Sequence, residues 1–245
     1  MSYEFDAQRI SQHIMKFCVD VRPGFNLNQD RADLQAFANW LIETHPALFE
    51  TLLCGPQQCQ VKKSFALNDG KTAQVATFAL APRGPVFTVP RRLFVGAPSE
   101  LGLDSFDPIF VEALKKLTLL FPGRLMPRVG IVHELIFDTN EENSLGILAR
   151  GLSEDRWQEN LRNVQIVLET VVSGKSVGIS MRPTFQSPVG AKAAQTPERK
   201  YGLIVNAEIS INQPNASITE EQILDLLRFS SFYVPQELIV YLGSI

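Results

Sequence analysis

Three segments in the second half of the chain alternate apolar and polar residues, at positions 129–137, 164–172 and 203–211. Successive side chains of a β-strand point to opposite faces of the sheet, so each segment places its apolar residues on one face. This pattern predicts an antiparallel sheet with one face packed against a core and the other face toward water.

We expect the sheet to contain one long hairpin and two further strands. The hairpin spans about residues 163–182 with a tight turn near 173–175, and the other strands span about 128–138 and 202–212. Amphipathic helices elsewhere in the chain would pack against the Val/Ile/Leu face. The predicted fold class is therefore α+β, with an antiparallel sheet packed by helices.

The N-terminal part is predicted to be mainly helical. Residues 5–17 form a first helix, because Ile10, Ile14 and Phe17 fall on one side of it. A second helix begins at Asn28 or Asp30, and a short continuation covers residues 47–53. The apolar stripe of the second helix consists of residues at helical spacing, namely Leu34, Phe37, Ala38 and Leu41.

A smaller hairpin follows the N-terminal helices. Residues 59–65 and 71–80 are its predicted strands, joined by Asp69-Gly70, a dipeptide typical of tight hairpin turns. Short strands are expected at 86–89 and 93–95, where nearby prolines favour a sheet edge.

Two further helices have clear terminal signals. Asp107 and Pro108 begin one that ends near Phe121, because proline is well tolerated at the first helical position. Thr219 and Gln222 have the spacing of a capping box for the last helix. A short helix is expected over 139–151, and residues 183–200 are predicted to be a long loop without regular structure.

The domain organisation has two interpretations. A helical and hairpin region would occupy residues 1–97, and the larger antiparallel-sheet region would occupy 104–245. A single continuous α+β domain fits the same pattern equally well.

Composition narrows the class of protein. The 245 residues include 45% apolar and 20% charged side chains with a net charge of −3, which is ordinary for a globular protein. That balance provides no electrostatic attraction to nucleic acid or to an anionic membrane, and we expect neither as a partner. Three cysteines without framework spacing argue against a disulfide framework, and the N-terminus has no apolar signal segment. We therefore expect a soluble, reduced, cytoplasmic protein.

The motifs associated with cofactors and metals are absent from the sequence. It contains neither G-x-x-x-x-G-K-[ST] nor G-x-G-x-x-G, the glycine patterns of phosphate-binding loops. His133-Glu134 resembles the start of H-E-x-x-H, but Phe137 occupies the position of the second histidine. We therefore expect no cofactor and no metal.

His133 is the residue with the clearest chemical interest. It alternates with the apolar residues of its segment and should point into the core, where an imidazole needs a hydrogen-bonding partner. One interpretation is a neutral core histidine bonded to the backbone. The other is a general base whose acid or nucleophile comes from elsewhere in the chain.

The opposite face of the predicted sheet carries several charged residues. Glu134, Glu169 and Glu208 would lie near each other if their strands are neighbours, and Arg182 would share that face. Carboxylates close together can divide the roles of acid and base, which would suit a hydrolase or a transferase. A solvated sheet face explains the same residues without any catalysis.

The function we predict from the sequence is non-enzymatic binding, with a protein partner or a small ligand. Candidate partner-binding residues are Arg91, Arg92 and Phe185. The alternative is an enzyme that uses the glutamate face. A third hypothesis is a small-molecule carrier whose apolar cavity is lined by residues 164–172.

Overall fold

The computed structural model describes residues 10–55, 59–66, 72–90, 106–139, 165–186 and 200–238. These residues form nine β-strands, three α-helices and one short π-helix. In chain order the elements are β1 (Ile10–Arg22), α1 (Arg31–Thr44), β2 (Thr51–Cys54), β3 (Cys59–Ala66), β4 (Thr72–Ala81), β5 (Gly84–Pro90), α2 (Phe106–Leu120), β6 (Leu125–Thr139), β7 (Ile166–Val172), β8 (Lys175–Gln186), β9 (Lys200–Asn212), α4 (Glu220–Tyr233) and η4 (Val234–Leu238).

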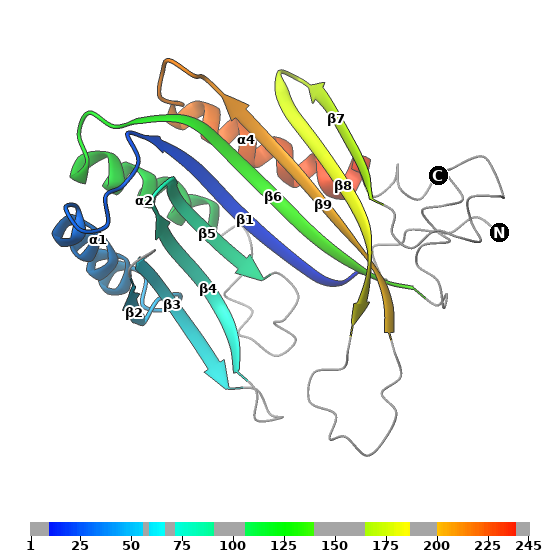
Figure 1. Cartoon of the computed structure of the whole chain (residues 1–245), viewed down its shortest axis with the longest axis horizontal. Helices are drawn as coiled ribbons and strands as arrows, with labels where there is room; N and C mark the ends of the chain where they lie inside the picture. The colour runs from blue at the N-terminus through cyan, green and yellow to red at the C-terminus, as the bar shows by residue number, and fades with distance from the viewer. Residues whose placement is uncertain are drawn as a thin grey trace. The chain divides into compact units, whose positions relative to one another are not determined.

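The nine strands form one antiparallel sheet in the order β2-β3-β4-β5-β1-β6-β9-β8-β7 (Figure 1). The predicted α+β class is confirmed, and so are the long hairpin and the two strands beside it. Among the described strands, β2 and β7 are the outermost. The sheet is larger than the sequence indicated, because β1 and the strands of the smaller hairpin belong to it as well.

The residues group into two compact units. The helical unit comprises Ile14–Val132 and Ile209–Phe229, and the hairpin unit comprises Met1–His13, His133–Glu208 and Ser230–Ile245. Both units are assembled from separate segments of the chain, because the division passes through β1, β6, β9 and α4. The boundary near residues 97–104 stays a prediction.

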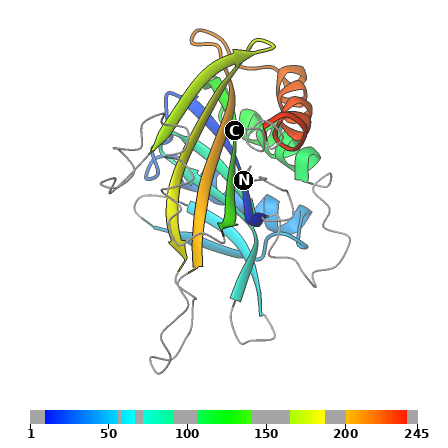
Figure 2. The same cartoon turned by 90° about the vertical axis from the view of Figure 1, so that its right-hand side faces the viewer.

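Aromatic side chains fill the core of the helical unit. Its α1 and α2, together with the first part of α4, lie on one side of its strands (Figure 2). The largest fully buried side chains there include Phe17, Phe37, Phe49, Phe78, Phe87 and Phe110. Each such ring removes a large apolar area from water, so these residues dominate the stability of the unit.

The helix predicted over residues 5–17 is wrong for the part that the structure describes. Residues 10–22 form β1, in which Met15, Phe17, Val19 and Val21 are all buried and alternate with more exposed residues. β1 pairs with β5 in a register that joins Phe17 to Phe87. The helical spacing of Ile10, Ile14 and Phe17 did not decide the structure. The alternation of buried and exposed residues did, because β5, which is distant in sequence, pairs with this segment.

Two other local predictions are corrected. Residues 51–54 form β2 rather than the end of a helix, and they pair with β3 in a register that runs from Thr51↔Lys62 to Cys54↔Cys59. The chain from 183 to 186 continues β8 instead of beginning a loop. Thr139, the first residue of the expected helix over 139–151, ends β6, and Lys200, the last residue of the predicted loop, begins β9. The rest of that helix and loop and the expected strand over 93–95 lie outside the described residues.

The helix predictions elsewhere are confirmed. α1 buries its apolar stripe completely, and α2 covers the predicted segment to within one residue at each end. At the start of α4, the backbone N–H of Thr219 donates to Gln222 Oε1 at 2.9 Å, and the N–H of Gln222 donates to Thr219 Oγ1 at 3.3 Å. This reciprocal pair is the predicted capping box.

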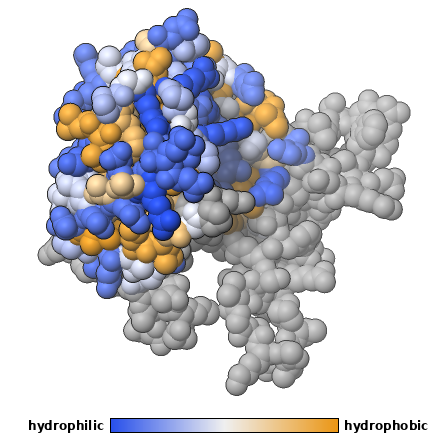
Figure 3. Space-filling model, turned by 60° about the vertical axis from the view of Figure 1, so that its left-hand side comes forward, coloured by the Kyte–Doolittle hydropathy of each residue, from blue (hydrophilic) through white to orange (hydrophobic). Residues whose placement is uncertain are grey.

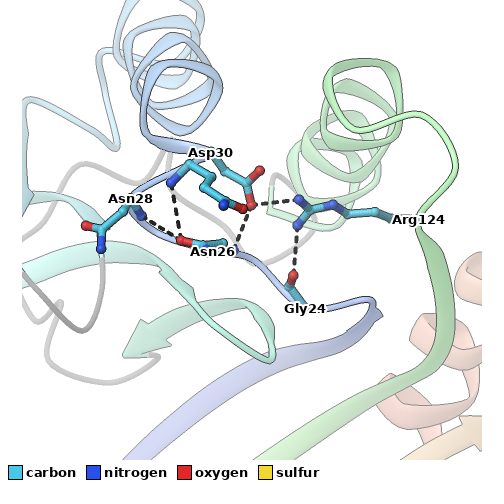
Figure 4. Close-up of polar contacts among 6 residues, drawn as sticks. Gly24, Asn26, Asn28, Asp30 and Arg124 are labelled. Carbon is cyan, nitrogen blue, oxygen red and sulfur yellow. Dashed lines mark hydrogen bonds and ion pairs between the residues drawn. The ribbon is translucent and has the colours of Figure 1, made fainter.

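A partly buried ion pair fixes the loop between β1 and α1 (Figure 4). Arg124 Nη2 lies 2.6 Å from Asp30 Oδ2, and Arg124 Nη1 donates to the carbonyl oxygen of Gly24 at 3.2 Å. The guanidinium lies 4.9 Å from the ring centre of Phe25 and 4.8 Å from that of Phe121. Arg124 thus joins the segment after α2 to the loop before α1 by charge, hydrogen bond and ring contact.

Candidate functional site

The hairpin of β7 and β8 has a regular register. It runs from Ile166↔Met181 to Val172↔Lys175 without a shift, around the two-residue turn of Ser173 and Gly174. Both turn residues have positive φ, 51° and 74°, as the tight hairpin turn with right-handed strand twist requires. The turn therefore determines which residues of the two strands are paired.

Both faces of β7 are exposed over its central residues. Val167 is 57% exposed, Leu168 40% and Val171 71%, and Glu169 and Thr170 between them are exposed as well. The prediction that Leu168 and Thr170 face a packed core is wrong. Their strand is the last of the described sheet, and its central residues are exposed on both faces.

Backbone groups of β7 also point away from the sheet. Residues that flank a two-residue hairpin turn exchange two backbone hydrogen bonds, and this arrangement recurs at every second pair along an antiparallel ladder. Counting back from Val172↔Lys175, the N–H and C=O groups of Val167, Glu169 and Val171 point away from β8. Within the described residues, β8 is the only strand paired with β7.

Among the described residues, β7 has little of the protection usual for an outer strand. Native edge strands are typically blunted by lysine, proline or a bulge. β7 has the sequence IVLETVV, with Glu169 as its one charged residue, and its register shows no bulge. On the different face shown in Figure 3, apolar side chains form small patches separated by polar ones. An exposed apolar strand with unpaired backbone groups is a template for a further strand.

One signal of this site was present in the sequence. Val167 and Val171 fall on the face that alternation assigns to polar residues, beside Gln165 and Glu169. Two valines on a face expected to meet water indicate a contact surface rather than a purely solvated one. The position of the strand at the end of the sheet was not visible in the sequence.

His133 lies in the core, as predicted, with 1% of its surface exposed. Its Nδ1 is 3.0 Å from Nε2 of His13 on β1, and its Nε2 is 2.6 Å from Oγ of Ser230 on α4. The two imidazole rings are 5.2 Å apart between centres. All three residues belong to the hairpin unit, where this hydrogen-bonded chain joins β1, β6 and α4.

The order hydroxyl, imidazole, imidazole matches that of a nucleophile, a base and a group that orients the base. Ser230, however, is only 1% exposed, and so is His133. A substrate carbonyl has no access to a hydroxyl oxygen buried to this extent. The arrangement suits a structural link that satisfies buried polar groups. Both of these partners of His133, His13 and Ser230, are side chains, whereas the first interpretation expected a bond to the backbone.

The three glutamates are not brought together. Glu134 on β6 and Glu208 on β9 lie on neighbouring strands, but β8 separates the strand of Glu169 from β9. Arg182 on β8 is exposed and has no ion-pair partner among the described residues. The predicted cluster required all three strands to be neighbours, and β7, which carries Glu169, is not next to β6 or β9. Among the described residues, no group of three His, Cys, Asp or Glu side chains could hold a metal ion.

The predicted partner-binding residues stay predictions. Arg91 and Arg92 lie outside the described residues, directly after the end of β5. Phe185 lies on β8, but its side chain is not among those that the structure describes.

The cysteines divide into a bonded pair and a free thiol. Cys54 and Cys59 face each other across β2 and β3 and form a disulfide. One such bond is a link between adjacent strands and not a disulfide framework, but it contradicts the expectation that the cysteines are reduced. Stable disulfides are typical of oxidising compartments, and the cytoplasmic location stays a prediction without support from this bond.

We expect slow alkylation of Cys18, the free thiol. Burial raises the pKa of the Cys18 thiol, an effect that Arg128 and Lys16 oppose and Asp20 adds to. Because the thiolate is the reactive form, iodoacetamide at pH 8 should modify the folded protein about ten-fold more slowly than the unfolded chain. The pKa of this thiol is higher in the folded state than in the unfolded state. Its contribution to the free energy of unfolding is therefore fully present below the unfolded-state pKa, and it is lost as the pH rises through the folded-state pKa.

Mass spectrometry under non-reducing conditions measures this reaction, since the other two cysteines are then bonded. Equal rates for the folded and the unfolded chain would contradict the assignment of Cys18 as a partly buried thiol of low reactivity.

Comparison with known proteins identifies no relative: no family model matches the chain, and no curated protein sequence matches it. None of the described helices has both the length and the apolar composition needed to cross a bilayer.

Proposed function

We propose that this protein is a binding module that captures an extended segment of a partner protein along β7. The observation that carries this proposal is a run of five exposed residues on the outer strand of the sheet, three of them large and apolar. In this mode of recognition the backbone of the partner supplies hydrogen bonds, and alternate side chains supply specificity.

The side chains of β7 define the partner that fits. Val167, Glu169 and Val171 lie on one face, and Glu169 has no hydrogen bond or ion pair among the described residues. A partner strand that presents a lysine or an arginine between two apolar residues complements this face. The other face, with Leu168 and Thr170, suits threonine or small apolar residues.

Other functions have less support. The hydrolase or transferase hypothesis needs carboxylates close together, and Glu169 is separated from the other two by a strand. The carrier hypothesis needs a cavity lined by residues 164–172. A cavity of about 480 Å³ that the structure does describe is lined by residues of α2 and α4 instead.

A charge swap at Glu169 tests the proposal. The probe is a fluorescent heptapeptide, Thr-Val-Thr-Lys-Thr-Val-Thr, with a second peptide that carries Glu in place of Lys. We expect the wild-type protein to bind the lysine peptide, and Glu169→Lys to reverse the preference by about five-fold for each peptide. Fluorescence anisotropy measures both affinities.

Hydrogen exchange locates the bound peptide. The amides of Val167, Glu169 and Val171 should exchange rapidly in the free protein and become protected on binding. Val167→Pro removes one outward N–H without disturbing the β7–β8 ladder and should weaken binding of both peptides. Leu119→Lys, which introduces a lysine at a 76% exposed position of α2, outside the hairpin unit, is the control for Glu169→Lys and should leave both affinities unchanged.

Two results would overturn the proposal. One is the absence of saturable binding of the lysine peptide to the wild-type protein. The other is binding that protects amides elsewhere while those of β7 continue to exchange freely.

A further inference from the structure

The disulfide between Cys54 and Cys59 lies in the helical unit, where an outer strand ends. β2 is one of the two outermost described strands, and Cys54 is its last residue (Figure 1). Cys59 is the first residue of β3 and is its direct partner in the register. Opposite residues of an antiparallel pair point to the same face, so the bond links neighbouring side chains and not distant elements.

The two bonded residues differ in their access to solvent. Cys59 is 3% exposed, and Val61, the next residue on the same face of β3, is fully buried. Leu80, which pairs with Cys59 from β4, is fully buried as well. Cys54 is exposed, and so is Leu53 before it. A small molecule in solution therefore reaches the disulfide from the side of Cys54.

Contacts other than the disulfide attach the start of β2 to β3. The backbone N–H of Glu50, directly before β2, donates to the carbonyl oxygen of Lys62 at 3.1 Å. Lys63 Nζ donates to the carbonyl oxygen of Pro46 at 2.8 Å. The side chain of Phe49 is fully buried. The disulfide therefore adds a link at the far end of β2, and opening it should release that end alone.

We propose that the Cys54–Cys59 bond is a reversible redox site that exchanges with low-molecular-weight thiols, and that Cys54 Sγ is the sulfur they attack. Exchange requires a thiolate to reach one sulfur of the bond while the other sulfur leaves. The exposure of Cys54 and the burial of Cys59 assign these two roles. This inference does not depend on the proposed function of β7, which belongs to the other unit.

Reduction takes place in two exchange steps. A thiolate RS⁻ first attacks Cys54 Sγ and forms a mixed disulfide, and the electron pair of the broken bond passes to Cys59 Sγ, which takes a proton from water. A second RS⁻ then attacks the R sulfur of the mixed disulfide, which releases RSSR and leaves Cys54 as a thiolate that is protonated in turn. Two electrons have then passed from two RSH molecules to the protein, whose two cysteines are thiols.

The fold also favours the reverse reaction. The two cysteines are separated by five positions in the sequence, so little chain entropy is lost when the loop between them closes. The pairs from Thr51↔Lys62 to Leu53↔Gln60 do not require the disulfide and keep β2 beside β3. An oxidised thiol, RSSR, should therefore restore the bond, which gives the site two interconvertible states.

Reduced glutathione is the probe for opening the bond in the folded wild-type protein. Free thiols are blocked with N-ethylmaleimide at intervals, and mass spectrometry after proteolysis measures the reduced fraction of each cysteine. We expect Cys54 and Cys59 to become reduced while the circular dichroism spectrum is unchanged. Amides of β2 should exchange about ten-fold faster in the reduced protein, and those of α1 at the same rate as before. Oxidised glutathione should reverse both changes.

Matched variants test which sulfur is attacked. Cys59→Ala leaves Cys54 as a free thiol, and Cys54→Ala leaves Cys59. With oxidised glutathione, Cys54 should form the mixed disulfide about ten-fold faster than Cys59, because it is the exposed residue. Cys18, present in both variants, is the internal reference and should react slowly in each. In the wild-type protein, rapid acid quenching during reduction should trap glutathione on Cys54, a measurement that needs no variant.

The inference fails if glutathione reduces the bond only in the unfolded chain, or if the trapped adduct is on Cys59. It also fails if the circular dichroism spectrum of the folded protein is lost as the bond opens, since the disulfide would then hold the whole unit and not the end of β2. Any of these results obtained while the β7 peptides still bind would leave the proposed function intact.

Discussion

Phe87→Ala is expected to lower the free energy of unfolding by about 4 kcal/mol. Phe87 is fully buried on β5 in the middle of the aromatic core. Its ring centre lies 5.8 Å from that of Phe17, 5.7 Å from Phe78, 6.0 Å from Phe49 and 6.4 Å from Phe110. Alanine would leave a cavity among four rings that cannot move inward independently, since two of them lie on the paired strands β1 and β4.

Chemical denaturation followed by circular dichroism and by tryptophan fluorescence measures this change. Phe232→Ala is the control, because Phe232 on α4 is 58% exposed and its truncation should cost less than about 1 kcal/mol. If Phe87→Ala lowered the free energy of unfolding no more than Phe232→Ala does, the aromatic cluster would not be a main source of stability for the helical unit.

Asp30→Ala is expected to lower the free energy of unfolding by about 2 kcal/mol. The substitution removes the partner of the Arg124 guanidinium, which is largely shielded from water. The side chain of Arg124 is 18% exposed and that of Asp30 is 15% exposed, so the charge left behind is only partly resolvated. Asp30 Oδ2 also accepts a hydrogen bond at 2.7 Å from the backbone N–H of Asn26 (Figure 4). The substitution therefore loosens the loop and leaves a cation between two aromatic rings.

A double-mutant cycle distinguishes the unpaired charge from lost packing. If the charge is responsible, Asp30→Ala combined with Arg124→Met should be more stable than Asp30→Ala alone. The control is Lys115→Ala, in an ion pair whose side chains are 57% and 49% exposed and whose loss should cost about 0.5 kcal/mol or less. If Lys115→Ala lowered the free energy of unfolding more than Asp30→Ala does, the partly buried pair would not be the more stabilising of the two ion pairs.

Elements with strong local signals were predicted correctly from the sequence. The capping box at Thr219 and the apolar stripe of α1 depend on residues three or four positions apart, which interact as soon as a helical turn forms. The inward face of β6, including His133, followed in the same way from strict alternation over nine residues. The buried position of His133 was therefore predictable, while its partners His13 and Ser230 were not, because they are 120 and 97 residues away.

The errors have a common physical origin in distant pairing. β1 combines a weak helical spacing with a period-two pattern, and pairing with β5, some seventy residues later, decides between them. In β7 the alternation was present, but burial of Leu168 required an element to cover it. A strand at the end of the described sheet has no such cover, so the same pattern that buries β6 leaves β7 exposed.

For this protein, the sequence alone determined the fold class, the capped helices and the residues that can face a core. These properties arise from steric preferences and from contacts within one turn or one strand. Only the tertiary structure decided which strand is outermost, which charges are left unpaired and which two helices line a cavity. Those properties depend on strand order and on helix packing, and side chains far apart in the chain settle them together.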